Sequence, residues 1–185
     1  MHNEFPEIFK MVHCISFEKM GEADFAYVSI YDYEQFMSVG QPLFMRVNEV
    51  CKDSLRTEEN FEQGYFSGLH NIKTFRGYFL HELTHILELS ILFKSSFKGE
   101  VFQESYEDYQ LMKAPMHDIS KQIYNVVFET NSLKMSPLDE KKYGKKTFSE
   151  FFAETMAEYW ELDSAKQYVK DIHNEACNQY NFYNS

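Results

Sequence analysis

The chain has 185 residues, 44% of them hydrophobic and 17% aromatic, and its formal net charge is −11. This length suits one domain, and the apolar content is typical of a globular protein rather than a disordered one. The negative charge argues against nucleic acid as a partner, and no stretch is long and apolar enough to predict a membrane span.

The first third of the chain mixes helix and strand signals. Residues 26–33 alternate and are rich in aromatic and β-branched residues, which predicts a strand. Residues 42–50 are compatible with a second strand or a short helix, and the polar run 52–63 with a surface helix or loop. Gly77 suits the end of a loop just before the next helix.

That helix contains the run His81-Glu82-Leu83-Thr84-His85, which has the pattern HExxH. Two histidines four residues apart lie on one face of a helix and can share a tetrahedral zinc ion. The glutamate between them can take a proton from a water molecule at that ion. Strongly apolar neighbours predict a buried helix that stops near Gly99. The alternative is a half-exposed helix whose polar residues face the solvent.

The rest of the chain is expected to be mainly helical. Three helices are predicted: residues 116–131, residues 148–160, and a last helix that Asp163 could cap and that extends to about residue 180. Thr147 is a plausible N-cap of the second of them, with Glu150 three residues on, which matches a capping box. Residues 94–115 lack clean periodicity and are interpreted as a long excursion that could border the active site.

A catalytic zinc site needs a third protein ligand. The pattern HExxHxxGxxH would supply a histidine, but the corresponding positions hold Glu88 and Ile91, so that class is excluded. Glu150, Glu154 and Glu158 share one face of the later helix, so one of them can bind zinc while the next supports it by hydrogen bonds. The alternative is an acidic stripe that faces the solvent.

The later segment also resembles a known family. Tyr143-Gly144 precedes Glu150 by seven residues, and residues 150–154 read EFFAE. This pattern resembles the catalytic domain of anthrax lethal factor and the related small Pro-Pro endopeptidases. The resemblance covers roughly residues 75–92 and 141–160. The stretch between His85 and Glu150 is longer than the family leads one to expect.

The resemblance implies a role for each of six residues. The zinc ligands would be His81, His85 and Glu150. Glu82 would be the general base, Tyr143 would donate its hydroxyl to the oxyanion of the transition state, and Glu154 would support a ligand.

Together these signals predict an α+β fold of the zincin type over residues 1–185, a single catalytic domain. Residues 1–75 would contain a small mixed sheet, and residues 76–185 the HExxH helix, the C-terminal helices and the metal site. The predicted function is that of an endopeptidase with one zinc ion, acting on a protein or peptide that binds along a sheet edge. A proline-rich target is suggested by the family alone.

Three alternatives stay open. The chain could be an intracellular regulatory peptidase of the repressor-cleaving type, a binding module with a structural zinc ion, or a toxin effector with the same chemistry. No signal peptide is visible at the amino end, which leaves either an intracellular protein or a mature domain without its signal. We favour secretion, or delivery into a host cytosol. Cys14, Cys51 and Cys177 are odd in number and widely spaced, which predicts buried free thiols.

Overall fold

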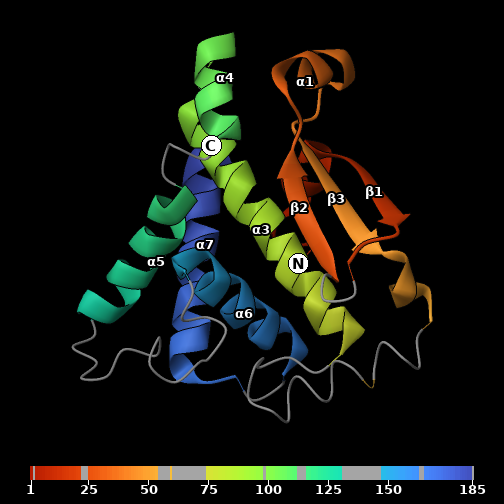
Figure 1. The fold of residues 1–185 in the computed structure, drawn as a ribbon. Helices are drawn as coiled ribbons and strands as arrows, with labels where there is room; N and C mark the ends of the chain where they lie inside the picture. The colour runs from red at the N-terminus through yellow and green to blue at the C-terminus, as the bar shows by residue number, and fades with distance from the viewer. Residues whose placement is uncertain are drawn as a thin grey trace.

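The structure is a computed structural model. It describes residues 1, 3–21, 25–53, 59, 74–97, 99–111, 116–130, 147–162 and 165–184. Figure 1 shows an α+β arrangement in which a small sheet lies on one side of a long central helix and several further helices lie on the other side.

The sheet is mixed and has the order β1-β3-β2. Its strands are β1 (Val12–Glu18), β2 (Ala26–Ile30) and β3 (Leu43–Asn48). β1 pairs with β3 in parallel, and β2 pairs with β3 antiparallel. Along β3 the side chains of Leu43, Met45 and Val47 are buried while Phe44 and Arg46 are only partly buried, so one face of the sheet packs against the core.

The strand predicted over residues 26–33 is confirmed for Ala26–Ile30 and ends earlier than expected. Asp32 caps helix α1 (Tyr33–Val39) by accepting a hydrogen bond from the backbone N–H of Gln35, 2.8 Å away. Gly40 ends this helix in the left-handed conformation, with φ of 77°. For residues 42–50 the strand alternative is correct, because β3 occupies Leu43–Asn48. A short 3-10 helix, η2 (Glu49–Lys52), follows β3, and another, η1 (Pro6–Met11), precedes β1.

The central helix α3 spans Phe75–Ser96 and is buried as predicted, since Arg76 and Ser96 are its only exposed residues. It begins two residues before Gly77, because Thr74 is the N-cap and accepts a hydrogen bond from the Gly77 N–H at 3.0 Å. The Thr74 hydroxyl in turn donates to the carboxylate of Glu161, which lies 87 residues away in the sequence. The start of α3 is therefore fixed by a distant part of the chain.

Four more helices follow α3. They are α4 (Gln103–Gln110), α5 (Met116–Thr130), α6 (Phe148–Glu161) and α7 (Gln167–Asn184). The helices predicted over 116–131 and 148–160 are confirmed, and Thr147 caps α6 by accepting from the Glu150 N–H at 3.1 Å. The last helix begins at Gln167; Asp163, its expected cap, lies outside the described residues.

The described part of residues 94–115 is not an irregular excursion. It contains the end of α3 and the helix α4, whose buried Tyr106 and Tyr109 pack against Phe97. The Tyr109 hydroxyl donates to the Leu89 carbonyl at 3.2 Å. In Figure 1, α4 accordingly lies at the C-terminal end of α3, away from the half that contains the histidines.

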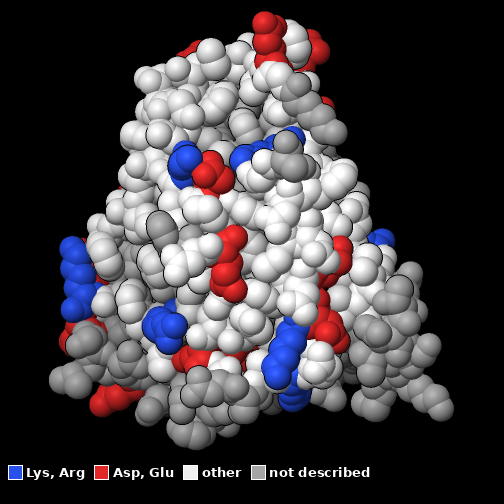
Figure 2. Space-filling view, turned by 180° about the vertical axis from the view of Figure 1, so that it is seen from behind, with Lys and Arg blue, Asp and Glu red and all other residues white. Residues whose placement is uncertain are grey.

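The charges on the surface, the cysteines and the lengths of the helices complete the description of the fold. Figure 2 shows acidic and basic side chains interspersed on one face of the molecule rather than gathered into a patch of one sign. Cys14, Cys51 and Cys177 are free thiols, but the predicted burial holds only for Cys51, since Cys14 is exposed and Cys177 is partly buried. Among the helices described, none has the length and apolarity that crossing a membrane requires.

Candidate metal centre

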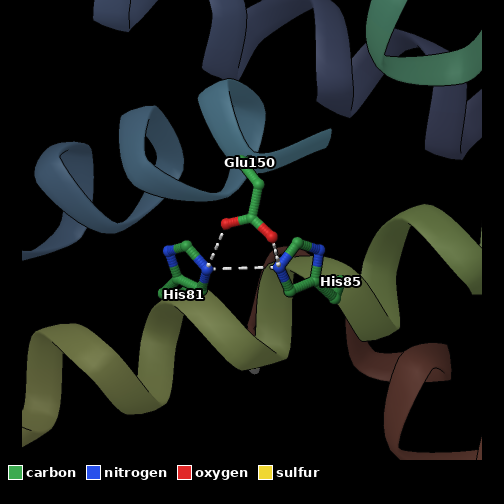
Figure 3. A group of neighbouring side chains, drawn as sticks. All are labelled: His81, His85 and Glu150. Atoms are coloured by element: carbon green, nitrogen blue, oxygen red, sulfur yellow. Dashed lines mark hydrogen bonds and ion pairs between the residues drawn. The ribbon is translucent and has the colours of Figure 1, made fainter. Parts of the chain in front are cut away.

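Two helices bring three potential metal ligands together. His81 and His85 lie one turn apart on α3, and Glu150 reaches them from the first turn of α6 (Figure 3). One ligand atom from each residue lies within 4.8 Å of the other two. Within the part of the chain that the structure describes, this is the group of histidine, cysteine and acidic side chains suited to a metal ion.

The distances fit a single tetrahedral ion. The two Nε2 atoms of His81 and His85 are 3.1 Å apart. Oε2 of Glu150 lies 3.4 Å from His81 Nε2, and Oε1 of Glu150 lies 3.9 Å from His85 Nε2. Ligands about 2.0–2.1 Å from a tetrahedral zinc ion are about 3.3 Å from one another. Two imidazole nitrogens and one carboxylate oxygen form a donor set typical of catalytic zinc.

The site is buried on one side and open on the other. The His81 side chain is 7% exposed, whereas those of His85 and Glu150 are 15% and 26% exposed. The solvent-facing alternative for the helix is therefore wrong. So is the solvent-facing alternative for the acidic stripe, because Glu154 and Glu158 are buried.

Each histidine also has a polar partner at its second ring nitrogen. His81 Nδ1 lies 3.4 Å from the Glu154 carboxylate, which agrees with the supporting position predicted for Glu154. His85 Nδ1 lies 3.3 Å from the hydroxyl of Ser149 and 3.8 Å from Glu88. Metal-binding histidines commonly donate this second N–H to a carboxylate or a similar acceptor, which fixes the orientation of the ring.

The charges around His81 favour a cation at this point. Burial lowers the pKa of His81, but hydrogen bonds to Glu150 and Glu154 outweigh burial and raise the pKa to about 10. For Glu150, burial raises the pKa of the carboxyl group. The hydrogen bond with His81 and the nearby charge of His85 outweigh burial, so the pKa of Glu150 is lowered. A positive charge is thus stabilised here, whether a proton or a metal ion supplies it.

Glu82 lies on the side of α3 that faces the sheet. It lines a small apolar cavity of about 10 Å³, room for about one water molecule, between α3 and the strands. Met45, Val47 and Tyr78 are among the other residues around this cavity. The negative charge of Glu82 also contributes to the raised pKa of His81.

One predicted site residue lies outside the described part of the chain, and two residues beside His85 were not predicted. Tyr143, the expected oxyanion donor, lies outside the described residues. The contacts of Ser149 and Glu88 with His85 were not anticipated. A signal for Glu88 was present, because an acid three residues after His85 in a fully apolar helix requires a polar partner. No comparable signal distinguished Ser149.

Comparison with known proteins adds no relative. No family model, curated protein or solved structure matches this chain. The resemblance to the lethal factor group therefore depends on the residues quoted above, and the site is interpreted from its own geometry.

Proposed function

We propose that this chain is a zinc-dependent endopeptidase of the zincin type, with His81, His85 and Glu150 as the zinc ligands. The observation that supports the proposal most directly is the convergence of these three side chains at the distances given above. Two imidazoles and one carboxylate suit zinc, whereas calcium and magnesium prefer sites made entirely of oxygen.

Glu82 is the proposed general base. Zinc, when bound, supplies a Lewis acid that polarises the scissile carbonyl and lowers the pKa of water. The Glu82 carboxylate accepts the proton of the attacking water and delivers it to the departing amine. The adjacent apolar cavity reduces the competing solvent around this carboxylate. Tyr143 is proposed as the donor to the developing oxyanion, on the resemblance alone.

The sheet provides a plausible track for the substrate. The order β1-β3-β2 places β2 at an edge, and of the two edge strands β2 is the one that packs against α3. An extended peptide can add to such an edge through its backbone hydrogen bonds. Phe25 and Ala26, at the start of β2, line the same cavity as Glu82, so a peptide on this edge would pass beside the general base.

The proposal is tested by metal content and peptide cleavage in the native chain and in Glu82→Gln. Both proteins should bind one zinc ion, because Glu82 is not a ligand, while cleavage of a mixed peptide library should fall about 10²–10⁴-fold in the variant. His85→Ala should lose the zinc ion and serves as the control for the ligand set.

The outcomes separate the alternatives. A native chain that binds no metal would refute the ligand assignment. Equal cleavage by the native chain and Glu82→Gln would refute the role of Glu82. Tight zinc binding without cleavage in either protein would favour the binding module with structural zinc.

A further inference from the structure

His85 is contacted by two residues that are not part of the HExxH motif. Ser149, on α6, places its hydroxyl oxygen 3.3 Å from His85 Nδ1. The same hydroxyl lies 2.5 Å from Oε2 of Glu88 on α3. Glu88 is 0% exposed and Ser149 is 3% exposed, so neither side chain is paired with solvent.

The hydrogens in this chain of contacts can be assigned. A carboxylate only accepts hydrogen bonds, so the single hydroxyl hydrogen of Ser149 is donated to Glu88. With its hydrogen used, the Ser149 oxygen can only accept from His85. The hydrogen of a neutral His85 ring is then on Nδ1, and Nε2 presents a lone pair toward His81 and Glu150.

We propose that Ser149 and Glu88 are positioning residues that fix the tautomer and the ring orientation of His85, so that Nε2 is ready to bind a metal ion. The inference rests on the proposed function in one respect, namely that Nε2 of His85 is a ligand. It extends that function by assigning a role to two residues that neither the motif nor the family resemblance includes.

The two histidines are therefore oriented in different ways. His81 faces a carboxylate directly, through Glu154, which lies one turn beyond Glu150 on the same helix. His85 reaches its carboxylate through a hydroxyl that comes from α6, while the carboxylate itself comes from α3. The orientation of His85 consequently depends on the docking of α6 against α3, which also delivers Glu150.

Burial of Glu88 supports a role beyond packing. Its second oxygen, Oε1, is buried and has no hydrogen-bond partner within the described ranges. A buried carboxylate is costly unless positive charge lies near it. A metal ion bound at Nε2 would supply such a charge on the far side of His85, and the Glu88 carboxylate, hydrogen-bonded through Ser149, would make the imidazole a more basic ligand.

The first test needs no metal. The ¹⁵N chemical shifts of the His85 ring are measured in the chelator-treated protein at alkaline pH, where a free imidazole is neutral. The native chain should show the hydrogen on Nδ1, and Ser149→Ala should show a mixture of both tautomers. A native ring with its hydrogen on Nε2, or a ring unaffected by Ser149→Ala, would overturn the proposal whether or not the protein is a peptidase.

The second test measures zinc affinity by competition with a chromophoric chelator. Ser149→Ala should bind zinc about 10–100-fold more weakly than the native chain. Glu88→Gln, which still accepts from Ser149 but lacks the charge, should lie between the two. Ser90→Ala is the matched control, because Ser90 is a buried serine on α3 that donates to the Ile86 carbonyl at 2.6 Å and does not serve a histidine.

The results distinguish this inference from the proposed function. Native affinity in both Ser149→Ala and Glu88→Gln would refute the positioning role while leaving the zinc site intact. An equal loss in Ser90→Ala would show that altered packing alone weakens binding, which also refutes it. If the native chain binds no zinc, the proposed function fails, and the tautomer measurement still decides whether the Ser149–Glu88 contact orients His85. If Ser149→Ala does not fold, Glu88→Gln provides the comparison.

Discussion

The two halves of α3 are both buried, yet they are buried against different kinds of neighbour. The first half, residues 75–88, directs His81, His85 and Glu88 toward polar partners on α6. The second half, residues 89–96, lies against rings from α1 and α4. The difference shows that burial alone does not mark a site, whereas buried polar groups arranged around one point do.

The second half of α3 is surrounded by packed aromatic rings, many of them from α1 and α4. Phe36 and Tyr106 are stacked with their ring centroids 4.7 Å apart, and Phe93 meets Tyr109 edge-on at 5.3 Å. Such rings bury a large apolar area and add favourable ring–ring contacts. We therefore expect the second half to stabilise the helix on which the first half presents its ligands, so that substitutions in the two halves should have separable effects.

The largest expected effect is that of Tyr106→Ala on α4, which packs beside the second half of α3. Removing a fully buried ring leaves a cavity and should lower the free energy of unfolding by about 3–5 kcal/mol. Urea denaturation measures this loss, and the folded fraction should retain native zinc affinity. A variant that keeps its stability but loses zinc would contradict the separation of the two halves.

The next largest effect is a dependence of the free energy of unfolding on pH, which should differ between the two halves. In the metal-free protein, burial lowers the pKa of His81, but its carboxylate partners raise it from 6.5 to about 10. The raised pKa contributes stability that is fully present below pH 6.5 and is lost as the pH rises toward 10. The loss is on the order of a few kcal/mol.

The tyrosines of α4 beside the second half of α3 should affect stability only at higher pH. Burial raises the pKa of Tyr106 and of Tyr109 above 10, so their contribution to stability is lost beyond that point. Urea denaturation as a function of pH should therefore show two successive declines in the metal-free protein. Zinc saturation should remove the first decline and leave the second, and persistence of both would argue against His81 as a ligand.

Zinc binding should stabilise the native chain, by less than the loss expected for Tyr106→Ala. At a free zinc concentration 100 times the dissociation constant, the free energy of unfolding should rise by about 2.7 kcal/mol. Unfolding in buffered zinc and in chelator measures the difference. Tyr109→Phe, altered only on α4 beside the second half of α3, should keep this increment, whereas Glu150→Gln should lose most of it. An undiminished increment in Glu150→Gln would contradict the ligand set.

The smallest expected effect is that of Thr74→Ala at the start of the first half. The variant loses the N-cap of α3 and the hydroxyl that donates to Glu161, and it should be destabilised by about 1 kcal/mol. Thr74→Ser keeps the hydroxyl and should be close to native. Thermal unfolding of both variants measures the effect, and equal losses would show that the cap is not responsible.

The elements that the sequence predicted best have strong local signals. The four-residue spacing of His81 and His85 and the cap at Thr147 predict α3 and α6, and both helices are found. β1 was missed because its alternation changes phase: residues 12–14 and residues 15–18 each alternate between apolar and polar, and the register on β3 shifts between Val12 and Cys14. α1 was missed because its cap, Asp32, stands inside an aromatic run typical of a strand.

The candidate site was predictable in part for the same reason. Local spacing relates His81 to His85, and Glu150 to Glu154. Ser149 and Glu88 are 61 residues apart in the sequence, and their contact depends on how α6 docks against α3. Local sequence patterns contain no information about that docking.

The contact between Thr74 and Glu161 bears on when the site can form during protein synthesis. Helix α3 leaves the ribosome long before α6, so its N-cap residue and both histidines must wait for partners that are translated much later. Contacts between residues so distant in sequence form slowly, after local helices have already appeared. A nascent chain would thus expose HExxH on an incompletely supported helix and become competent to retain a metal ion only once α6 has emerged.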